Sequence, residues 1–327
     1  MRLLDPLDLR LLDGFQRDLP VAPRPYRAIG RALGLGEDEV IARLARLVDG
    51  GAVTRVGGTC RPNTAGASTL AAMALPDHRI EEVAAAVGAE EGVNHSYLRE
   101  NRFNLWFVAT GPDRAAVQGL LGRLRARTRL EVLDLPLVRP FNVDLGFALD
   151  GLAPAPPARP ARPDVLEPGD RPILQALSDG LALTPRPFAA LAADLGRGEA
   201  EVLQRIRVLL AAGLIGRLGV IVRHRRLGWT ANAMVVWQVP EAAVEAAGGA
   251  LVEVPGVTLC YQRLPAGTAW PYTLYCMIHA RSRAEALAVL GRAEAAAGLD
   301  GLPREVLFSL RCFKQRGALV VARGAAA

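Results

Sequence analysis

The chain has 327 residues, a net charge of +6 at pH 7, 51% hydrophobic and 22% charged residues, and four cysteines that form no paired motif. These values indicate a folded chain of two to four domains and argue against disorder, a disulfide framework and a zinc site built from paired cysteines. The sequence shows no secretory signal and no charge-free run long enough to cross a bilayer, so we expect a cytoplasmic protein. The positively charged residues are almost all arginine, which favours an anionic partner.

One pattern occurs twice along the chain, at an offset of 162 residues. Residues 23–26, Pro-Arg-Pro-Tyr, return as residues 185–188, Pro-Arg-Pro-Phe, and the match continues through the glycines and arginines that follow. The period is far longer than that of solenoid repeats, so each copy is expected to be a whole module with more than one part. The sequence therefore predicts a covalent pseudo-dimer.

Each copy begins with a predicted winged helix-turn-helix, over residues 1–60 and 170–222. In the first copy Pro25 opens one helix, Glu37 begins the next in a first turn rich in acids, and Gly50 ends it. A short strand follows in each copy and is interpreted as the wing.

Each copy continues with a predicted ferredoxin-like domain, over residues 61–150 and 223–327. The order strand-helix-strand-strand-helix-strand is typical of that fold. Residues 151–169 between the copies are rich in proline and alanine and are expected to form an extended linker. The predicted fold class is α+β, a tandem duplication of a winged helix-turn-helix and a ferredoxin-like βαββαβ domain.

This pair of domains resembles the Lrp/AsnC family of transcription regulators. The resemblance implies DNA binding by the first domain, and small-ligand sensing with dimerisation by the second. The recognition helices argue against DNA, because their first turns carry carboxylates that repel phosphate: Glu37, Asp38 and Glu39 in one copy, Glu199 and Glu201 in the other. We do not expect DNA as a partner. A regulator that senses a tetrapyrrole or another small anion remains the alternative function.

The first motif with chemical content lies on a predicted strand of each ferredoxin-like domain. His95, Tyr97 and Arg99 alternate along one strand and therefore share a face, and Tyr261 and Arg263 repeat the pattern. A histidine, a phenol and a guanidinium in a row suit an anion-binding pocket better than a core. A solvated sheet face is the alternative interpretation.

The second motif joins the second wing to the second ferredoxin-like domain. His224 lies between Arg223 and Arg225, whereas the first copy has Arg61 and Pro62 in the corresponding segment. Neighbouring positive charges disfavour the cationic imidazole until an anion arrives. A basic wing that touches nucleic acid is the alternative interpretation. The remaining histidines, His78 and His279, are expected to be structural.

These motifs together resemble the siroheme decarboxylase family, with this chain as a fusion of its two related subunits joined at residues 151–169. Trp229 stands where a tyrosine would be expected. The resemblance rests on three runs of residues: His95, Tyr97, Arg99 and residues 103–106; Arg223, His224, Leu227, Gly228 and Trp229; Arg311, Phe313 and Lys314.

The resemblance implies a non-oxidative carboxy-lyase. It would remove CO₂ from two acetate side chains of siroheme to give didecarboxysiroheme, on a route to heme d1 or to heme by an alternative pathway. It implies siroheme as an iron tetrapyrrole substrate, no required cofactor, no membrane and a homo-oligomer of the fused chain. We expect no metal site formed by the protein alone.

The resemblance also implies roles for residues. His95 and His224 are the expected proton donors, and Tyr97 is expected to orient one of them; either histidine could instead approach the siroheme iron axially. The expected substrate-binding residues are Arg61, Arg99, Arg102, Trp106, Arg223, Arg225, Tyr261, Arg263 and Lys314.

The two copies differ at both histidines. His95 corresponds to Leu259, and His224 corresponds to Pro62. If the two ferredoxin-like domains pair face to face, both histidines could reach one shared pocket while the pseudo-symmetric pocket is degraded. An insertion at residues 266–270 would reshape that second pocket. We therefore predict one productive site per chain.

Overall fold

The computed structural model describes residues 4–146, 149 and 160–322, so most of the predicted linker lies outside the described residues. The chain forms two compact units, and each takes the same part from both copies. The helical unit comprises the described residues of Met1–Ala65, Gly146–Leu149 and Arg159–Leu227, and the barrel unit those of Gly66–Leu145 and Gly228–Ala327. No helix within these described ranges is both long and apolar enough to cross a membrane.

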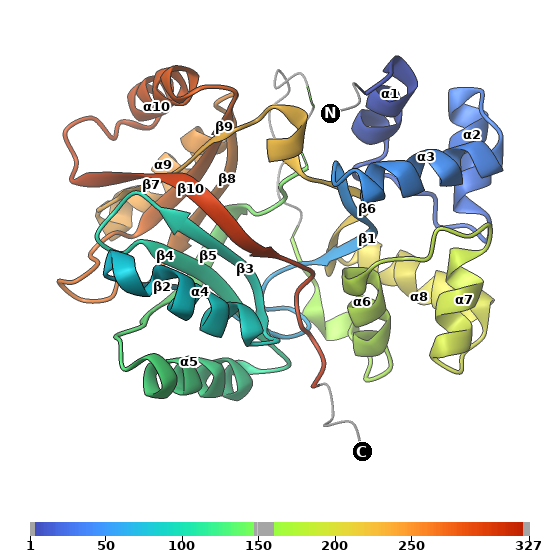
Figure 1. Cartoon of the computed structure of the whole chain (residues 1–327), viewed down its shortest axis with the longest axis horizontal. Coiled ribbons are helices and arrows are strands. Elements are labelled where there is room, and N and C mark those ends of the chain that lie inside the picture. The colour runs from blue at the N-terminus through green and yellow to red at the C-terminus, as the bar shows by residue number, and fades with distance from the viewer. Residues whose placement is uncertain (1–3, 147–148, 150–159, 323–327) are drawn as a thin grey trace. The chain divides into compact units, whose positions relative to one another are not determined.

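The helical unit contains a three-helix arrangement from each copy (Figure 1). Asp5 caps the first helix in a capping box with Asp8, and Gly34 ends the second helix with a φ of 75° that glycine adopts without strain. The helices are α1 (Pro6–Gly14), α2 (Pro25–Leu33), α3 (Glu37–Asp49), α6 (Asp170–Asp179), α7 (Pro187–Asp194) and α8 (Glu199–Ala211), with the short turns η2 (Pro163–Val165) and η3 (His224–Leu227).

The two predicted wing strands do not form separate hairpins. β1 (Val53–Cys60) pairs antiparallel with β6 (Ile215–Val222), and Gly57 of one copy lies opposite Gly219 of the other. A lone strand leaves its backbone groups unpaired, and the duplicated strand satisfies them. The glycines permit close packing, because a Cβ at Gly57 would lie 2.4 Å from the carbonyl oxygen of Leu177.

The barrel unit contains the predicted strand-helix-strand-strand-helix-strand order twice. The first copy supplies β2 (Ala67–Met73), η1 (Asp77–Arg79), α4 (Ile80–Ala89), β3 (Val93–Arg99), β4 (Leu105–Gly111), α5 (Arg114–Thr128) and β5 (Leu133–Asn142). The second copy supplies β7 (Ala231–Trp237), α9 (Glu241–Val252), β8 (Val257–Arg263), β9 (Leu274–Ala280), α10 (Arg283–Ala297) and β10 (Arg304–Gln315).

The strands form one closed barrel in the order β10-β3-β4-β2-β5-β8-β9-β7. The sheets of the two ferredoxin-like domains are thus joined at both edges into one barrel. The last strand of each copy is long enough to pair with both copies: β5 joins β2 to β8, and β10 joins β7 to β3. Closure leaves neither sheet with an unpaired edge.

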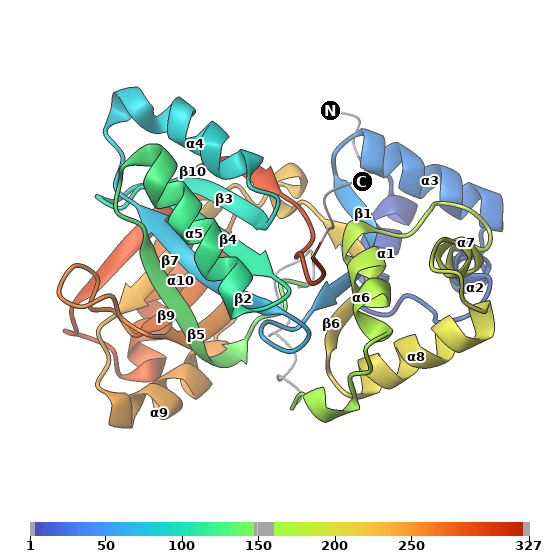
Figure 2. The same cartoon turned by 90° about the horizontal axis from the view of Figure 1, so that it is seen from below.

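The barrel separates an inner core from two outer cores. One outer core lies under α4 and α5, the other lies under α9 and α10, and the helices of each pair contact one another (Figure 2). Phe141 of β5 packs on the outer core of the second copy, and Phe313 of β10 packs on that of the first. The inner core contains residues of both copies, including Trp106, Tyr261 and Tyr275.

Candidate active site

The first motif lies on the inner face of the barrel. His95 and Tyr97 of β3 lie opposite Val108 and Trp106 of β4, both of which belong to or pack against the inner core. His95 Nδ1 is 3.3 Å from Tyr97 Oη, and the two rings are stacked with centroids 6.3 Å apart. Because their register partners belong to the inner side, His95 and Tyr97 also face the interior of the barrel. Both side chains are partly exposed.

Arg99 continues this row and is held inside the barrel. Its side chain is 6% exposed, and its Nη1 donates to the carbonyl oxygen of Leu307 at 3.2 Å. Its Nη2 contacts Met277 Sδ at 3.8 Å, and its guanidinium carbon lies 5.4 Å from the centre of the Tyr97 ring. A guanidinium in such a setting favours an anionic ligand, because burial strengthens charge-assisted hydrogen bonds.

The second copy repeats the tyrosine and the arginine on β8. The guanidinium of Arg263 lies 4.6 Å from the centre of the Tyr261 ring, and its Nη1 donates to the carbonyl oxygen of Leu135 at 2.7 Å. Its Nε is buried and has no hydrogen-bond partner among the described residues. Burial lowers the pKa of Arg263 and raises the pKa of Tyr261. An anion that accepted from this Nε would offset the cost of burying the charge.

An aromatic cluster closes the end of the barrel where β3 and β8 end. Trp270 is 3% exposed, its ring centroid is 5.7 Å from Phe103 and 5.1 Å from Trp106, and its Nε1 donates to Tyr275 Oη at 2.8 Å. Trp270 and Tyr275 were not among the predicted site residues. The signal for Trp270 was the insertion, since ten residues join β8 to β9 whereas five join β3 to β4.

Not every predicted residue of the barrel unit faces its interior. Arg102 is exposed in the turn between β3 and β4, over the ring of Phe103. Lys314 donates from Nζ to the carbonyl oxygens of Gly88 and Glu90, both at 2.8 Å, at the end of α4. Lys314 therefore stabilises a helix end on the outside of the barrel, and its predicted contact with substrate has no geometric support.

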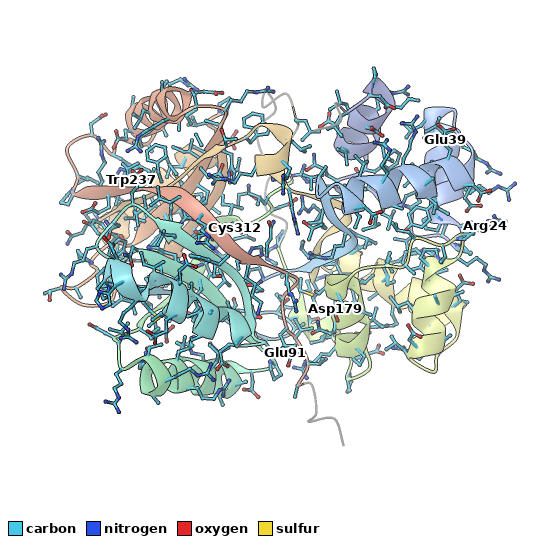
Figure 3. The ribbon with its side chains drawn as sticks, viewed as in Figure 1. Arg24, Glu39, Glu91, Asp179, Trp237 and Cys312 are labelled. Atoms are coloured by element: carbon cyan, nitrogen blue, oxygen red, sulfur yellow. The ribbon has the colours of Figure 1, made fainter. Side chains whose placement is uncertain are left out.

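Cys312, which is labelled in Figure 3, lies on β10. It is exposed, and its register partner on β3 is Tyr97. The adjacent residue Arg311 points to the outside of the barrel and forms an ion pair with Glu81. The inner face beside Tyr97 is thus accessible to solvent, in contrast to the aromatic end.

The second motif belongs to the helical unit. His224 begins η3 and is 6% exposed, Arg223 is partly buried, and Arg225 is exposed. Arg61 is also partly buried, and burial lowers its pKa. A pocket shared by His95 and His224 would join the two units, and it stays a prediction.

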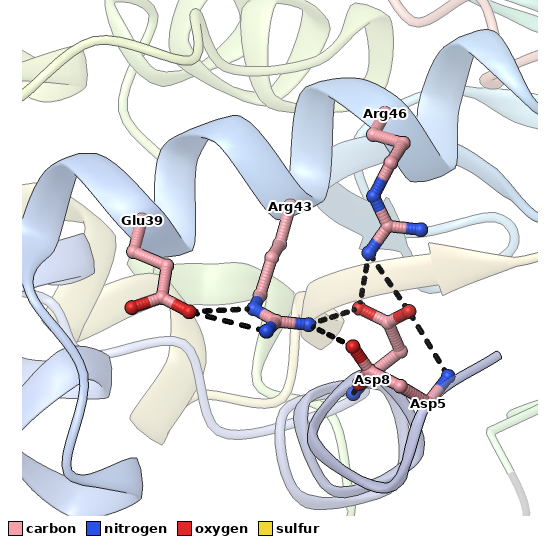
Figure 4. A network of polar contacts seen from close by, with 5 residues as sticks. All are labelled: Asp5, Asp8, Glu39, Arg43 and Arg46. Atoms are coloured by element: carbon pink, nitrogen blue, oxygen red, sulfur yellow. Dashed lines mark hydrogen bonds and ion pairs between the residues drawn. The ribbon is translucent and has the colours of Figure 1, made fainter.

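The arginines of the first recognition helix are engaged within the helical unit (Figure 4). Arg43 forms ion pairs with Asp5 at 2.6 Å and Asp8 at 3.0 Å, and Arg46 binds Asp8 at 2.7 Å. Asp8 is almost fully buried. Arg43 and Arg46 therefore hold α3 against α1.

The second copy contains the equivalent network. Arg205 of α8 binds Asp170 at 2.6 Å and Glu167 at 2.7 Å, and Asp170 is fully buried. In both copies the acid that begins the recognition helix is also paired, Glu37 with Arg24 and Glu199 with Arg186. Guanidinium groups that already pair with carboxylates are poorly placed to contact a phosphate backbone.

Comparison with known proteins places these features in a family. The family model described as AsnC-like ligand binding domain matches residues 65–142 and 226–314, and the model described as siroheme decarboxylase NirDL-like HTH domain matches residues 8–53 and 170–215. The siroheme decarboxylase NirDL subunit of Paracoccus denitrificans is 62% identical over 97% of this chain and 98% of its own length. The chain belongs to the siroheme decarboxylase family.

Two further family members bear on the duplication and on the ligand. The siroheme decarboxylase NirD subunit of Stutzerimonas stutzeri is 49% identical and aligns over 96% of its own length with only 45% of this chain, as expected for a fusion. The second is a solved structure, the crystal structure of the siroheme decarboxylase NirDL in co-complex with an iron-uroporphyrin III analogue, whose sequence is 27% identical to this chain. The two structures superpose with a TM-score of 0.67, and the match covers 94% of this chain and 92% of that chain. That family member therefore binds an iron-uroporphyrin III analogue.

Proposed function

We propose that this protein removes CO₂ from two acetate side chains of siroheme to give didecarboxysiroheme. The observation that supports it best is the inner face of the barrel, which carries Arg99, Arg263 and the partly exposed imidazole of His95 in a member of the siroheme decarboxylase family. Siroheme carries many carboxylates on a flat macrocycle, which is the kind of ligand that guanidinium and aromatic groups bind. The proposal includes a cytoplasmic enzyme that acts as a homo-oligomer.

The reaction needs a proton donor and no net electron transfer. The bond between the acetate methylene carbon and its carboxylate breaks, CO₂ leaves, and the electron pair passes into the conjugated macrocycle. A proton then converts the methylene to a methyl group. His95 and His224 are the candidate donors, and Tyr97, 3.3 Å from His95 Nδ1, would orient the His95 ring. We therefore propose no redox cofactor.

The arginines of the inner face would hold the carboxylates that do not react. Arg99 and Arg263 come from equivalent positions of the two copies, so they can bind separate side chains of one macrocycle. The aromatic end around Trp106 and Trp270 excludes water from that part of the barrel. Loss of charge as CO₂ is favoured in a setting of low polarity.

The regulator alternative receives no support from the helical unit. Arg43 of α3 and Arg205 of α8 pair with Asp8 of α1 and Asp170 of α6. Arg207 of α8 donates to the carbonyl oxygen of Val21 at 2.8 Å. We propose that the helix-turn-helix serves as a packing unit and that DNA is not a partner.

The test is to mix the purified chain with siroheme without oxygen and to follow the masses of the products. We expect successive losses of one and two CO₂ units, and titration by absorbance to reach an end point at one siroheme per chain. A chain that binds siroheme but releases no CO₂ would contradict the proposed activity. An end point of two equivalents would contradict a single productive site.

A second prediction concerns the buried arginine. Arg263→Met keeps most of the side-chain volume and is expected to weaken siroheme binding by about 10- to 100-fold, because a charge-assisted hydrogen bond contributes about 1.5–3 kcal/mol. Arg139→Met is the matched control, since Arg139 lies on the neighbouring strand but pairs outside the barrel with Glu245 at 2.9 Å. Equal affinities of the two variants would rule out Arg263 as a carboxylate ligand.

A further inference from the structure

The inner face of β10 carries side chains that were not among the predicted site residues. Two bulges interrupt the pairing of β10 with β3, one after Ser309 and one after Cys312. Lys314 lies beyond the second bulge and reaches the end of α4 on the outside of the barrel. The next residue, Gln315, is the register partner of His95. Because register partners in an antiparallel pair share a face, Gln315 faces the interior of the barrel beside the imidazole.

Two rows of side chains therefore lie next to each other on the inner face of the β3–β10 pair. Three uncharged residues of β10 are the register partners of the three site residues of β3, as the pairs Ser309–Arg99, Cys312–Tyr97 and Gln315–His95. Cys312 is exposed, and Gln315 is partly exposed, as His95 and Tyr97 are. A ligand that approaches His95 would thus also meet the side chain of Gln315.

The β5–β8 pair, which is equivalent to the β3–β10 pair, has an apolar row instead. β5 corresponds to β10, and its residues at the equivalent positions are Leu137, Pro140 and Val143. Leu137 and Val143 pack against the inner core, as does Leu259, which corresponds to His95. The strand pair that contains the imidazole therefore has hydrogen-bonding side chains beside it, whereas the equivalent row of β5 is apolar.

The side chain of Gln315 is available to a ligand. Its amide has two N–H donors and one carbonyl acceptor. Within the part of the chain that the structure describes, this amide has no hydrogen-bond partner, although it is partly withdrawn from solvent. A carboxylate beside His95 could accept a hydrogen bond from it.

An uncharged donor suits the carboxylate that reacts better than a guanidinium does. In the proposed reaction the bond between the methylene carbon and the carboxylate breaks, CO₂ leaves, the electron pair passes into the macrocycle and a proton converts the methylene to a methyl group. The carboxylate charge is therefore lost in the transition state. A charge-assisted hydrogen bond stabilises the starting carboxylate more than that transition state and slows the reaction, and the weaker bond from an amide does so less.

We propose that Gln315 binds the acetate carboxylate that leaves as CO₂ and so holds its methylene carbon beside His95. The inference rests on the proposed function and makes it specific. It separates an uncharged ligand of the reacting carboxylate, on β10, from Arg99 and Arg263, which hold the carboxylates that do not react.

The test compares siroheme affinity with the rate of CO₂ release in two variants of this residue. Gln315→Arg is expected to bind siroheme about 10-fold more tightly and to release CO₂ at least about 10-fold more slowly, because the added stabilisation is lost with the charge. Absorbance titration measures the affinity, and single-turnover mass spectrometry measures the rate.

The second variant, Gln315→Val, introduces the residue type that the first copy has at Val143. It is expected to weaken binding by about 3- to 10-fold and to slow CO₂ release by about 10-fold, because the acetate is no longer held beside His95. The two variants thus move the affinity in opposite directions while both lower the rate, which a merely structural role would not produce. The second variant also provides a reading should Gln315→Arg not fold.

A control variant adds the same charge elsewhere. Leu287→Arg places a guanidinium on the exposed side of α10, outside the barrel, and should leave affinity and rate unchanged. Tighter binding by Gln315→Arg at the wild-type rate would mean that Gln315 meets a carboxylate that does not react, and it would overturn the inference. Wild-type affinity and rate in both Gln315 variants would overturn it as well. Wild-type protein that released no CO₂ would instead refute the proposed function, and the inference with it.

Discussion

Replacing His95 by asparagine is expected to lower the rate of CO₂ release from siroheme by at least about 100-fold. The asparagine amide can occupy the position of Nδ1 and keep the contact with Tyr97 Oη, now 3.3 Å, but it carries no acid in place of Nε2. Binding should change by less than about threefold, because the arginines hold the carboxylates. Single-turnover mass spectrometry measures the rate, and absorbance titration measures the affinity.

Two comparisons sharpen this prediction. His224→Asn is also expected to lower turnover, whereas His78→Asn lies on an exposed turn and serves as the matched control. An axial ligand of the siroheme iron would change the absorption spectrum of the bound macrocycle when removed, and a proton donor would change the rate alone. Wild-type rates from both His95→Asn and His224→Asn would remove the acid role from these residues.

The fold could be predicted wherever it depends on local patterns. The 162-residue repeat, Pro25 at a helix start and the alternation of β3 are all visible in the sequence, and they lead to the element order that the structure has. The pairing of β1 with β6 and the closure through β5 and β10 could not be predicted. The alternation of hydrophobic and polar residues along a strand indicates which face of the strand is buried, but it does not indicate which other strand pairs with it.

The residues of the candidate site could likewise be predicted where they depend on local pattern and not where they depend on tertiary packing. His95, Tyr97 and Arg99 share a face because they alternate on one strand, and this needs no tertiary knowledge. Trp270 reaches the inner core from a loop, and loop conformation follows from the packing that receives it. Lys314 was placed by its motif alone, and the carbonyl oxygens of Gly88 and Glu90 that bind it come from a segment far away in the sequence. His279 was expected to be structural from its place at a strand end, and its partner, the Thr258 hydroxyl 2.7 Å from its Nδ1, lies on a different strand that the sequence does not name as its neighbour.

Asp170→Asn is expected to reduce the free energy of unfolding of the helical unit by about 3 kcal/mol, because it removes the buried carboxylate that Arg205 binds and leaves the exposed Glu167 as its charged partner. For a unit of this size the midpoint of thermal unfolding should fall by roughly 5–10 °C. Glu201→Gln is the matched control and should leave the midpoint unchanged, since Glu201 lies on the same helix as Arg205 and forms a surface ion pair with Arg197, which precedes that helix. Thermal unfolding followed by circular dichroism makes the comparison.

The effect of Asp170→Asn should depend on pH. Burial raises the pKa of the Asp170 carboxyl, but the hydrogen bonds from Arg205 and from the amide of Glu167 outweigh it, so the pKa lies below its ordinary value of 3.8. A carboxyl with a lowered pKa in the folded state stabilises above the unfolded value and loses that contribution as pH falls through the folded value. The difference between wild type and variant in urea unfolding should therefore be full at pH 7 and smaller at pH 3. A difference that stayed constant over this range would mean that the charge of Asp170 does not hold α8 against α6.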